Sequence, residues 1–266
     1  MKAGLLVNPK LRDSSALARN AYAIMSEFFE VELERDTAIL LNMEGIPLEK
    51  LRADFLVSVG GDGTLLWCFQ RTEMPILAVN MGNVGYLSES PMENLRCDME
   101  KITSRNYHID ERMKLSILVK GKNIPDAVNE GVIHTAHIAK IRGYKISVDG
   151  WTVAELRCDG IIVSTPTGST CYALSVGSPI LDPRLEAFVI APIAPYKLSA
   201  RPKVIPASSR ITIDILDDED CILVVDGQCQ YPLKGETITF FKSSEYARFI
   251  RFSDDVYRFV RDRLPV

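Results

Sequence analysis

The hydrophobic pattern of the chain changes near Tyr107, and this change constrains the fold more than any other feature. Before it, short apolar runs alternate with segments of helical spacing, which is the order of a parallel α/β sheet. After it, short β-like runs are separated by turn dipeptides. Hydrophobic residues make up 47% of the 266 positions, so two domains can each bury a core. We therefore predict an α/β domain followed by a mainly β domain.

The first domain is expected to be doubly wound. Apolar runs predict strands at residues 5–7, 54–60 and 75–80, and helical spacing predicts helices at 14–29 and 64–70. The tail at residues 254–264 returns to helical spacing, and we assign it to the same domain. The α/β domain is thus expected to comprise residues 1–100 and about 250–266.

The second domain, about residues 101–249, is expected to be mainly β. Asp149 and Gly150 stand between two alternating runs, which is a strong hairpin signal. The acidic run at residues 217–220 is expected to cap a solvated hairpin turn between two further strands. No linker rich in Pro, Gly or Ser separates the two halves, which favours a ligand site between the domains.

Composition argues against several classes of function. The net charge is −4 and Lys and Arg form no block, so nucleic-acid binding has little support. No apolar run approaches the roughly 20 residues that cross a bilayer, and the start does not resemble a signal peptide, so we expect a soluble, cytoplasmic protein. Six cysteines without CxxC pairs are typical of reduced thiols. His134 and His137 lack a third metal ligand at useful spacing, and we interpret them as surface or structural residues.

The sequence GGDGT at residues 60–64 directly follows a predicted buried strand and precedes a helix. Glycines there let backbone N–H groups approach a polyphosphate at the carboxyl edge of the sheet. The spacing is neither a Walker loop nor GxGxxG. A carboxylate at Asp62 is unfavourable beside phosphates unless it accepts a proton, orients a hydroxyl or helps to hold Mg²⁺. The alternative is a tight turn in which Asp62 only caps the helix.

A second motif, DGIIVSTPTGSTCYALSVGSPIL, spans residues 159–181. It predicts a buried strand, a polar loop and a short helix from about Ser169 to Val176. The loop offers hydroxyls and backbone donors to phosphates or ribose hydroxyls, although such hydroxyls also cap helices. Asp159 is interpreted either as an acceptor for ribose hydroxyls or as a turn residue.

Two adjacent polar residues, Asn129 and Glu130, interrupt an apolar, strand-like run. Buried polar groups need partners, so their presence there requires a reason. An Asn side chain can read an adenine edge, and a Glu can accept a hydrogen bond from a hydroxyl. The alternative is a β-bulge at Gly131.

Taken together, GGDGT, the Asn129-Glu130 pair and the motif at residues 159–181 resemble the NAD kinase family in order and spacing. The resemblance extends from the first strand to the DGQ at residues 226–228. The long motif is highly specific, whereas GGDG alone is shared with phosphofructokinases and diacylglycerol kinases. The resemblance implies a C-terminal β-sandwich-like domain, NAD bound between the domains, and a homodimer or homotetramer whose subunits share the site.

The resemblance also implies roles for individual residues. Asp62 would accept the proton of the 2′-hydroxyl on the adenosine ribose of NAD, giving NADP. The implied NAD-binding residues are Asp62, Gly63, Asn129, Glu130, Lys140, Arg157, Asp159, Thr170, Cys171, Tyr172, Ala173, Leu174, Ser175 and Gln228. The phosphate donor would lie against Gly60, Gly61, Gly63 and Thr64. Mg²⁺ or another divalent cation would neutralise its charge, with no protein ligands assigned, and ATP, another nucleoside triphosphate and polyphosphate stay open as donors.

Four positions depart from the family pattern. Cys171 stands where Ala is usual, Ser178 replaces a Gly, Tyr196 occupies a place often held by His, and Tyr86 one often held by Phe. None removes a proposed catalytic group, but they leave the preference between NAD and NADH open. Two rival hypotheses are a lipid or sugar kinase that shares the GGDG turn and a non-catalytic NAD-binding sensor.

Overall fold

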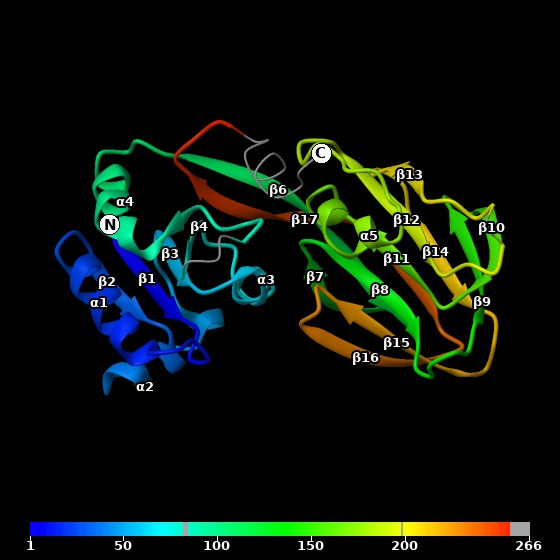
Figure 1. Ribbon diagram of the computed structural model, residues 1–266, viewed down its shortest axis with the longest axis horizontal. Coiled ribbons are helices and arrows are strands. Elements are labelled where there is room, and N and C mark those ends of the chain that lie inside the picture. The colour runs from blue at the N-terminus through cyan, green and yellow to red at the C-terminus, as the bar shows by residue number, and fades with distance from the viewer. Residues whose placement is uncertain (82–84, 198, 256–266) are drawn as a thin grey trace. The chain divides into compact units, whose positions relative to one another are not determined.

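The computed structural model describes residues 1–81, 85–197 and 199–255, and the chain divides into two compact units (Figure 1). The first unit comprises Met1–Glu111 and Ala247–Val266, and the second comprises Arg112–Tyr246. The strands β6 (His108–Val119) and β17 (Thr237–Arg251) each contribute residues to both units. The tail helix expected at residues 254–264 lies outside the described residues, apart from its first two positions.

The first unit is built on a parallel sheet with the strand order β4-β3-β1-β2. Its strands are β1 (Lys2–Val7), β2 (Glu30–Leu33), β3 (Phe55–Val59) and β4 (Ile76–Asn80). Every residue of β3 and β4 is buried, which explains why they appear as continuous apolar runs in the sequence. The strand order reverses at β1, with β2 on one side and β3 on the other. This reversal confirms the predicted doubly wound sheet.

Helices and short elements complete the first unit. They are α1 (Ser14–Ser26), α2 (Arg35–Leu41), α3 (Asp62–Phe69), α4 (Leu95–Thr103), the two-residue strand β5 (Ser90–Pro91), and 3-10 turns at Leu48–Lys50 and Met92–Asn94. Helix α1 buries Ala18, Ala21 and Met25, which share one helical face. The predicted elements in this region are confirmed, and β2, α2 and α4 were not predicted.

The second unit contains antiparallel strands in two sheets. One runs β10-β9-β14-β17, with β9 (Arg142–Val148), β10 (Trp151–Cys158) and β14 (Ile211–Ile215), and also includes β6 and β7 (Lys122–Ala127). The other runs β13-β12-β11-β8-β15-β16, with β8 (Glu130–Thr135), β11 (Gly160–Ser164), β12 (Ala187–Ile193), β13 (Lys203–Pro206), β15 (Asp220–Val225) and β16 (Cys229–Lys234). One hydrophobic cluster joins both sheets through side chains such as Tyr144, Ile161 and Phe240. The sheets therefore form the predicted β-sandwich-like domain.

Turns in the second unit bear out one expectation and correct two. Asp149 (φ 51°) and Gly150 (φ 85°) connect β9 to β10 in the left-handed conformation of a type I′ hairpin, as predicted. The hairpin expected around residues 217–220 is wrong, because β14 and β15 belong to different sheets. The β8 ladder to β11 runs without a register shift from Glu130 to His134, so the alternative of a bulge at Gly131 is also wrong.

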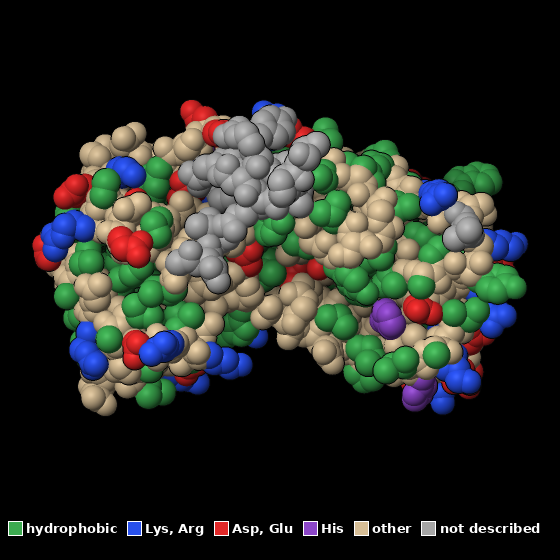
Figure 2. Space-filling view, in the orientation of Figure 1, with side chains coloured by type: hydrophobic (Ala, Val, Ile, Leu, Met, Phe, Trp, Pro, Cys, Tyr) green, Lys and Arg blue, Asp and Glu red, His purple; other side chains and the backbone are tan. Residues whose placement is uncertain are grey.

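Figure 2 shows how charged and apolar side chains are distributed over one face of the molecule. On the face shown in Figure 2, basic side chains are interspersed with acidic and apolar ones and are not gathered into one stripe. Among the residues that the structure describes, no helix combines the length and apolar character needed to span a membrane.

Candidate functional site

The GGDGT turn lies at the carboxyl end of the parallel sheet. It follows β3, and Asn8, the first residue after β1, donates a hydrogen bond from Nδ2 to Thr64 Oγ1 at 2.8 Å. The turn therefore sits at the point between β1 and β3 where the strand order reverses, which is where open α/β sheets bind ligands. Asn8 was not recognised from the sequence, and its place directly after the first strand is the signal that identifies it.

The first two glycines of the turn serve different purposes. A Cβ added to Gly60 would lie 2.5 Å from Thr64 Oγ1, so the helix that follows requires a glycine there. A Cβ added to Gly61 would meet no atom of the described residues within 4 Å. Gly61 is exposed and precedes the first turn of α3, so a phosphate can approach its backbone and the positive end of the helix.

Asp62 does not cap helix α3. Gly61 is the N-cap, and no side chain of the described residues caps the helix there. The Asp62 carboxylate instead accepts hydrogen bonds from the backbone N–H groups of Tyr86 at 2.8 Å and Leu87 at 3.3 Å. A Cβ added to Gly85 would lie only 2.0 Å from Asp62 Oδ1, so the loop packs directly on the carboxylate. The capping alternative is therefore wrong, and Asp62 is held from outside its own helix.

In the second unit, the Asn129-Glu130 segment is held on one side by Asp226. This buried carboxylate accepts the N–H groups of Val128 at 2.8 Å, Asn129 at 2.8 Å and Glu130 at 3.0 Å. Asp226 belongs to the β15–β16 turn, where it (φ 50°) and Gly227 (φ 65°) adopt left-handed conformations. The family resemblance implies a role for Gln228 in this motif, and the structural role of Asp226 was not predicted.

The same segment is held on its other side by Thr165 from the long motif. Thr165 N donates to Asn129 O at 2.8 Å, and its hydroxyl donates to Val128 O at 2.6 Å. A Cβ added to Gly168 would lie 2.2 Å from Asn129 O, so only glycine allows this approach. The predicted Asn129-Glu130 pair and the predicted polar loop are thus parts of one hydrogen-bonded structure.

Several acceptors of this structure are buried without a partner. Within the described residues, Asn129 Oδ1, Glu130 Oε2 and Thr167 Oγ1 have no hydrogen-bond partner. Burial, with a smaller effect of the Asp226 charge, raises the pKa of Glu130 to about 8. Burial also raises the pKa of Asp226 to about 6, although its three backbone donors oppose this rise. Unsatisfied buried acceptors are costly, so this site is suited to a ligand that brings hydroxyl or amino donors.

The remaining predicted residues surround this structure to different degrees. The 3-10 turn Thr167–Thr170 and the helix α5 (Tyr172–Ser175) carry the predicted run from Thr170 to Ser175, of which only Ala173 is buried. Gln228 Nε2 donates to Asp226 O at 3.3 Å. Asp159 is half-buried between β10 and β11, whereas Arg157 and Lys140 are exposed. Among the described residues, no side-chain contact of Lys140 or Arg157 joins them to the Asp226 network.

The departures from the family pattern and the histidines can also be located. Tyr196 is 76% exposed and its N–H donates to Arg157 O at 2.9 Å. Ser178 is buried, and its N–H donates to Ala173 O at 3.2 Å. The described residues contain no group of three or more His, Cys, Asp or Glu that could hold a metal ion, so His134 and His137 are not part of such a group there.

Comparisons with known proteins agree on one family. The ATP-NAD kinase N-terminal domain model matches residues 13–107, and the ATP-NAD kinase C-terminal domain model matches residues 128–252. The NAD kinase of Thermococcus gammatolerans is 45% identical over 259 residues, covering 92% of this chain and 93% of that protein. The NAD kinase of Thermoplasma acidophilum is 35% identical over 266 residues, covering 99% and 98%.

Solved structures share the fold. The crystal structure of an NAD kinase from Archaeoglobus fulgidus in complex with ATP has a TM-score of 0.79 and 32% identity, covering 98% of this chain and 96% of that one. Yeast NADH kinase complexed with NADH has a TM-score of 0.88 over 99% of this chain and 87% of its own, and at 23% identity it supports the fold alone. Because both family models match and the relatives are 35–45% identical over nearly the whole chain, the chain belongs to the NAD kinase family.

Proposed function

We propose that the protein transfers a phosphoryl group from ATP or polyphosphate to the 2′-hydroxyl of the adenosine ribose of NAD, giving NADP. Membership of the NAD kinase family supports the substrate and the reaction type. A related NAD kinase of known structure is in complex with ATP, which supports a nucleotide donor. The glycine turn would contact phosphates and not a base, so polyphosphate remains a second donor to test.

The observation that carries the proposal is the state of the Asp62 carboxylate. It lies beside an open glycine turn, it does not cap its helix, and two backbone amides from residues 86 and 87 fix its direction. Such a carboxylate can take the proton of the 2′-hydroxyl while the hydroxyl oxygen forms its bond to phosphorus. The bond from phosphorus to the leaving oxygen breaks in the same step, and ADP or shortened polyphosphate departs.

NAD would be read in the second unit by the acceptors that the protein leaves unsatisfied. Asn129 Oδ1 and Glu130 Oε2 are buried and aligned by Asp226, and ribose hydroxyls and the adenine amino group are suitable donors. Among the other residues assigned to NAD, Asp159 and the run Thr170–Ser175 belong to the motif at residues 159–181. Lys140 and Arg157 remain assignments from the family resemblance.

A divalent cation, Mg²⁺ in the proposal, would neutralise the donor's phosphates. The described residues offer no group of three or more His, Cys, Asp or Glu that could hold a metal ion, so no protein ligand is assigned. The family resemblance also leads us to propose a homodimer or homotetramer in the cytoplasm, which size-exclusion chromatography and cell fractionation would test.

The test is the substitution Asp62→Asn. The purified protein is incubated with NAD, Mg²⁺ and either ATP or polyphosphate, and NADP is assayed with an NADP-specific dehydrogenase. We expect Asp62→Asn to abolish turnover while calorimetry still shows NAD binding, because the contacts in the second unit persist. Asp36→Asn is a matched control, since Asp36 also lies in the first turn of a short helix, α2.

Each alternative outcome has a distinct meaning. Turnover by Asp62→Asn at the wild-type rate removes Asp62 from the mechanism. NAD binding by the wild type without NADP from any donor favours the NAD-binding sensor. Consumption of ATP with a lipid or sugar, but not with NAD, favours the other kinases that share the turn.

A further inference from the structure

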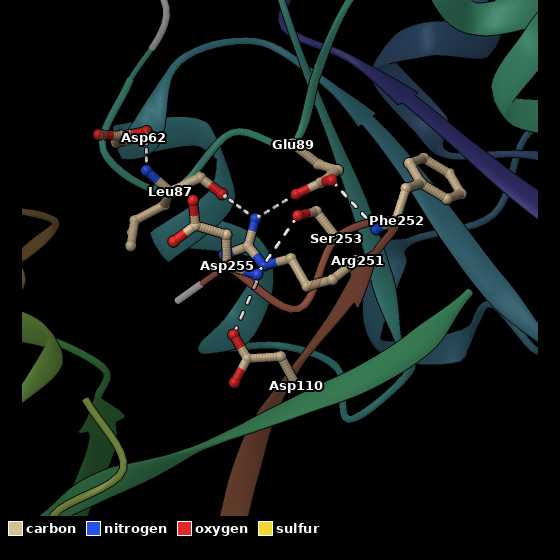
Figure 3. Close-up of polar contacts among 8 residues, drawn as sticks. All are labelled: Asp62, Leu87, Glu89, Asp110, Arg251, Phe252, Ser253 and Asp255. Atoms are coloured by element: carbon tan, nitrogen blue, oxygen red, sulfur yellow. Dashed lines mark hydrogen bonds and ion pairs between the residues drawn. The ribbon is translucent and has the colours of Figure 1, made fainter. Parts of the chain in front are cut away.

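Arg251, at the end of β17, is a buried cation with acceptors from two separate segments. Its side chain is 5% exposed, and Nη1 donates to Leu87 O at 3.0 Å and to Glu89 Oε2 at 3.1 Å. Nε lies 3.5 Å from Asp110 Oδ2. Figure 3 shows the guanidinium between these groups, with Asp62 on the far side of Leu87.

Leu87 connects this cluster to the proposed base. Its carbonyl accepts from Arg251, and its N–H donates to Asp62 Oδ1 at 3.3 Å. The preceding residue, Tyr86, gives Asp62 its shorter bond of 2.8 Å. A displacement of the Leu87 backbone away from Arg251 therefore also changes the donors that orient the Asp62 carboxylate.

Residues 85–89 lie in irregular structure, so no ladder of backbone hydrogen bonds sets their position. The backbone bond from Glu89 N to Ala78 O, at 2.9 Å, anchors only the end of the segment. The Glu89 carboxylate, which is 3% exposed, then joins this segment to Arg251, the last residue of β17, and to the N–H of the following residue, Phe252, at 3.1 Å. The side-chain contacts of Arg251 and Glu89 thus fix the position of this backbone segment, as strand pairing does in the sheet.

The end of β17 also contacts the helix that begins at Asp62. The ring of Phe249, two residues before Arg251, lies 4.7 Å from the ring of Phe69 in α3. The Arg251 guanidinium lies 4.7 Å from the centre of the Phe249 ring. One short segment therefore packs on the helix that carries the carboxylate and binds the loop that orients it.

Stability alone is a weak explanation for this cluster. Burying a guanidinium and a carboxylate costs desolvation energy, and apolar side chains of similar size are often as stable or more so. Charged hydrogen bonds differ from apolar contacts in that they fix the direction and position of their acceptors. The acceptor that distinguishes this cluster from a plain ion pair is the Leu87 carbonyl.

We propose that Arg251 and Glu89 are positioning residues for phosphoryl transfer, which hold residues 85–89 so that the Tyr86 and Leu87 amides fix the Asp62 carboxylate. The proposal rests on the proposed function, because it needs Asp62 to be the base. Neither Arg251 nor Glu89 is a catalytic residue, since they act through Leu87.

The test compares Arg251→Met with Arg248→Met. Arg248 lies on the same strand and pairs with Glu111 at 2.9 Å, but this pair is partly exposed. We expect Arg251→Met to lower kcat on the order of tenfold to a hundredfold with the KM for NAD within about twofold, because misplacement affects the reacting geometry and not NAD binding. Arg248→Met should keep kcat within about twofold of the wild type. Arg251→Lys should recover part of kcat, since an ammonium can reach some of these acceptors but lacks the planar fork.

Loss of folding is controlled by a double variant. Arg251→Met removes the cationic partner of the buried Glu89 carboxylate but leaves its bond from Phe252 N. The substitution is therefore also made in the background Glu89→Gln, which removes the negative charge and keeps an acceptor for Phe252 N. We expect the double variant to regain thermal stability but not kcat. Recovery of both together, or a kcat of Arg251→Met equal to that of Arg248→Met, would overturn the proposal. An active Asp62→Asn variant would instead overturn the proposed function, so the two failures are distinguishable.

Discussion

The Asp62 turn in the first unit and the Asn129-Glu130 segment in the second treat their polar groups in opposite ways. Asp62 is half-buried, and its carboxylate is already occupied by two backbone donors. Asn129 and Glu130 are buried, and each keeps an acceptor atom without a partner among the described residues. In the second case the hydrogen bonds go to the backbone, through Asp226 and Thr165, and leave the side chains unsatisfied.

The difference corresponds to two tasks. A proton acceptor must point in one direction before the substrate arrives, and fixed amide donors provide that orientation. A group that recognises a ligand gains most when its partner is missing in the free protein, because the ligand then removes an existing penalty. The backbone of the Asn129-Glu130 segment is therefore fixed by hydrogen bonds, while its side chains keep acceptor atoms that a ligand can satisfy.

Removal of Asp226 should have the largest effect. Asp226→Ala leaves three buried N–H groups without an acceptor, so we expect the free energy of unfolding to fall by about 3–5 kcal/mol. Urea-induced unfolding measures this loss. The KM for NAD should rise as well, because Asn129 and Glu130 lose their alignment.

Asp226→Asn is the matched comparison, since its amide oxygen can still accept from part of the segment. It should cost about 1–2 kcal/mol. If Asp226→Ala unfolds at the wild-type urea concentration and binds NAD normally, the rigid backbone of this segment does not depend on Asp226.

The unsatisfied state of Glu130 predicts a dependence of stability on pH. Burial raises its pKa from 4.5 to about 8 in the folded protein, whereas the unfolded chain releases the proton near the ordinary value. The stability that comes from this group is therefore complete below about pH 4.5 and is lost as the pH rises to about 8. Relative to Glu130→Gln, the wild type should lose about 3 kcal/mol between pH 5 and pH 8.

Asp226 changes in the same direction in both proteins, so the difference between the two stability curves reports mainly on Glu130. Saturating NAD should reduce this difference, because hydroxyl donors favour the ionised carboxylate. Parallel curves for the wild type and Glu130→Gln would show that Glu130 is already satisfied in the free protein.

Much of the fold could be predicted from local pattern. Strands β1, β3 and β4 are continuous apolar runs because helices and neighbouring strands bury both of their faces. Strand β2 was missed because it lies at a sheet edge. Its four residues, EVEL, alternate between acidic and apolar side chains, and most of them are not buried. The hairpin predicted at residues 217–220 was wrong because β14 and β15, although close in sequence, belong to different sheets.

The candidate site was predictable only where its parts are contiguous. The GGDGT turn and the polar loop at residues 164–170 are local, and their residue types indicate phosphate and hydroxyl chemistry. The contacts that hold them are distant: Asp226 is 97 residues from Asn129, and Arg251 is 164 residues from Leu87. No spacing rule indicates which backbone amide a remote carboxylate will meet, so these holding groups appear only in the folded chain.

The smallest predicted effect concerns Asp62, whose carboxylate already accepts two backbone hydrogen bonds. Gly85 packs so closely on Asp62 that an added Cβ would lie 2.0 Å from Oδ1, so Gly85→Ala must displace either the carboxylate or the loop. We expect kcat to fall about tenfold to thirtyfold, equivalent to about 1.4–2 kcal/mol, with NAD affinity unchanged, since the NAD-reading acceptors lie in the second unit. Steady-state kinetics and calorimetry measure the two quantities separately.

Gly143→Ala controls for the general effect of replacing glycine. Its added Cβ would lie 3.3 Å from Leu216 Cβ, in a strand of the second unit, so the substitution leaves the contact between Gly85 and Asp62 unchanged. Gly143 pairs with Arg157 across the β9–β10 ladder, so this control is compared for kcat and not for NAD affinity. It should change kcat less than about twofold. Equal losses of kcat in the two variants would mean that the fit between Gly85 and Asp62 has no special role. A loss confined to Gly85→Ala would show that the orientation of an already occupied carboxylate, and not its presence alone, limits phosphoryl transfer.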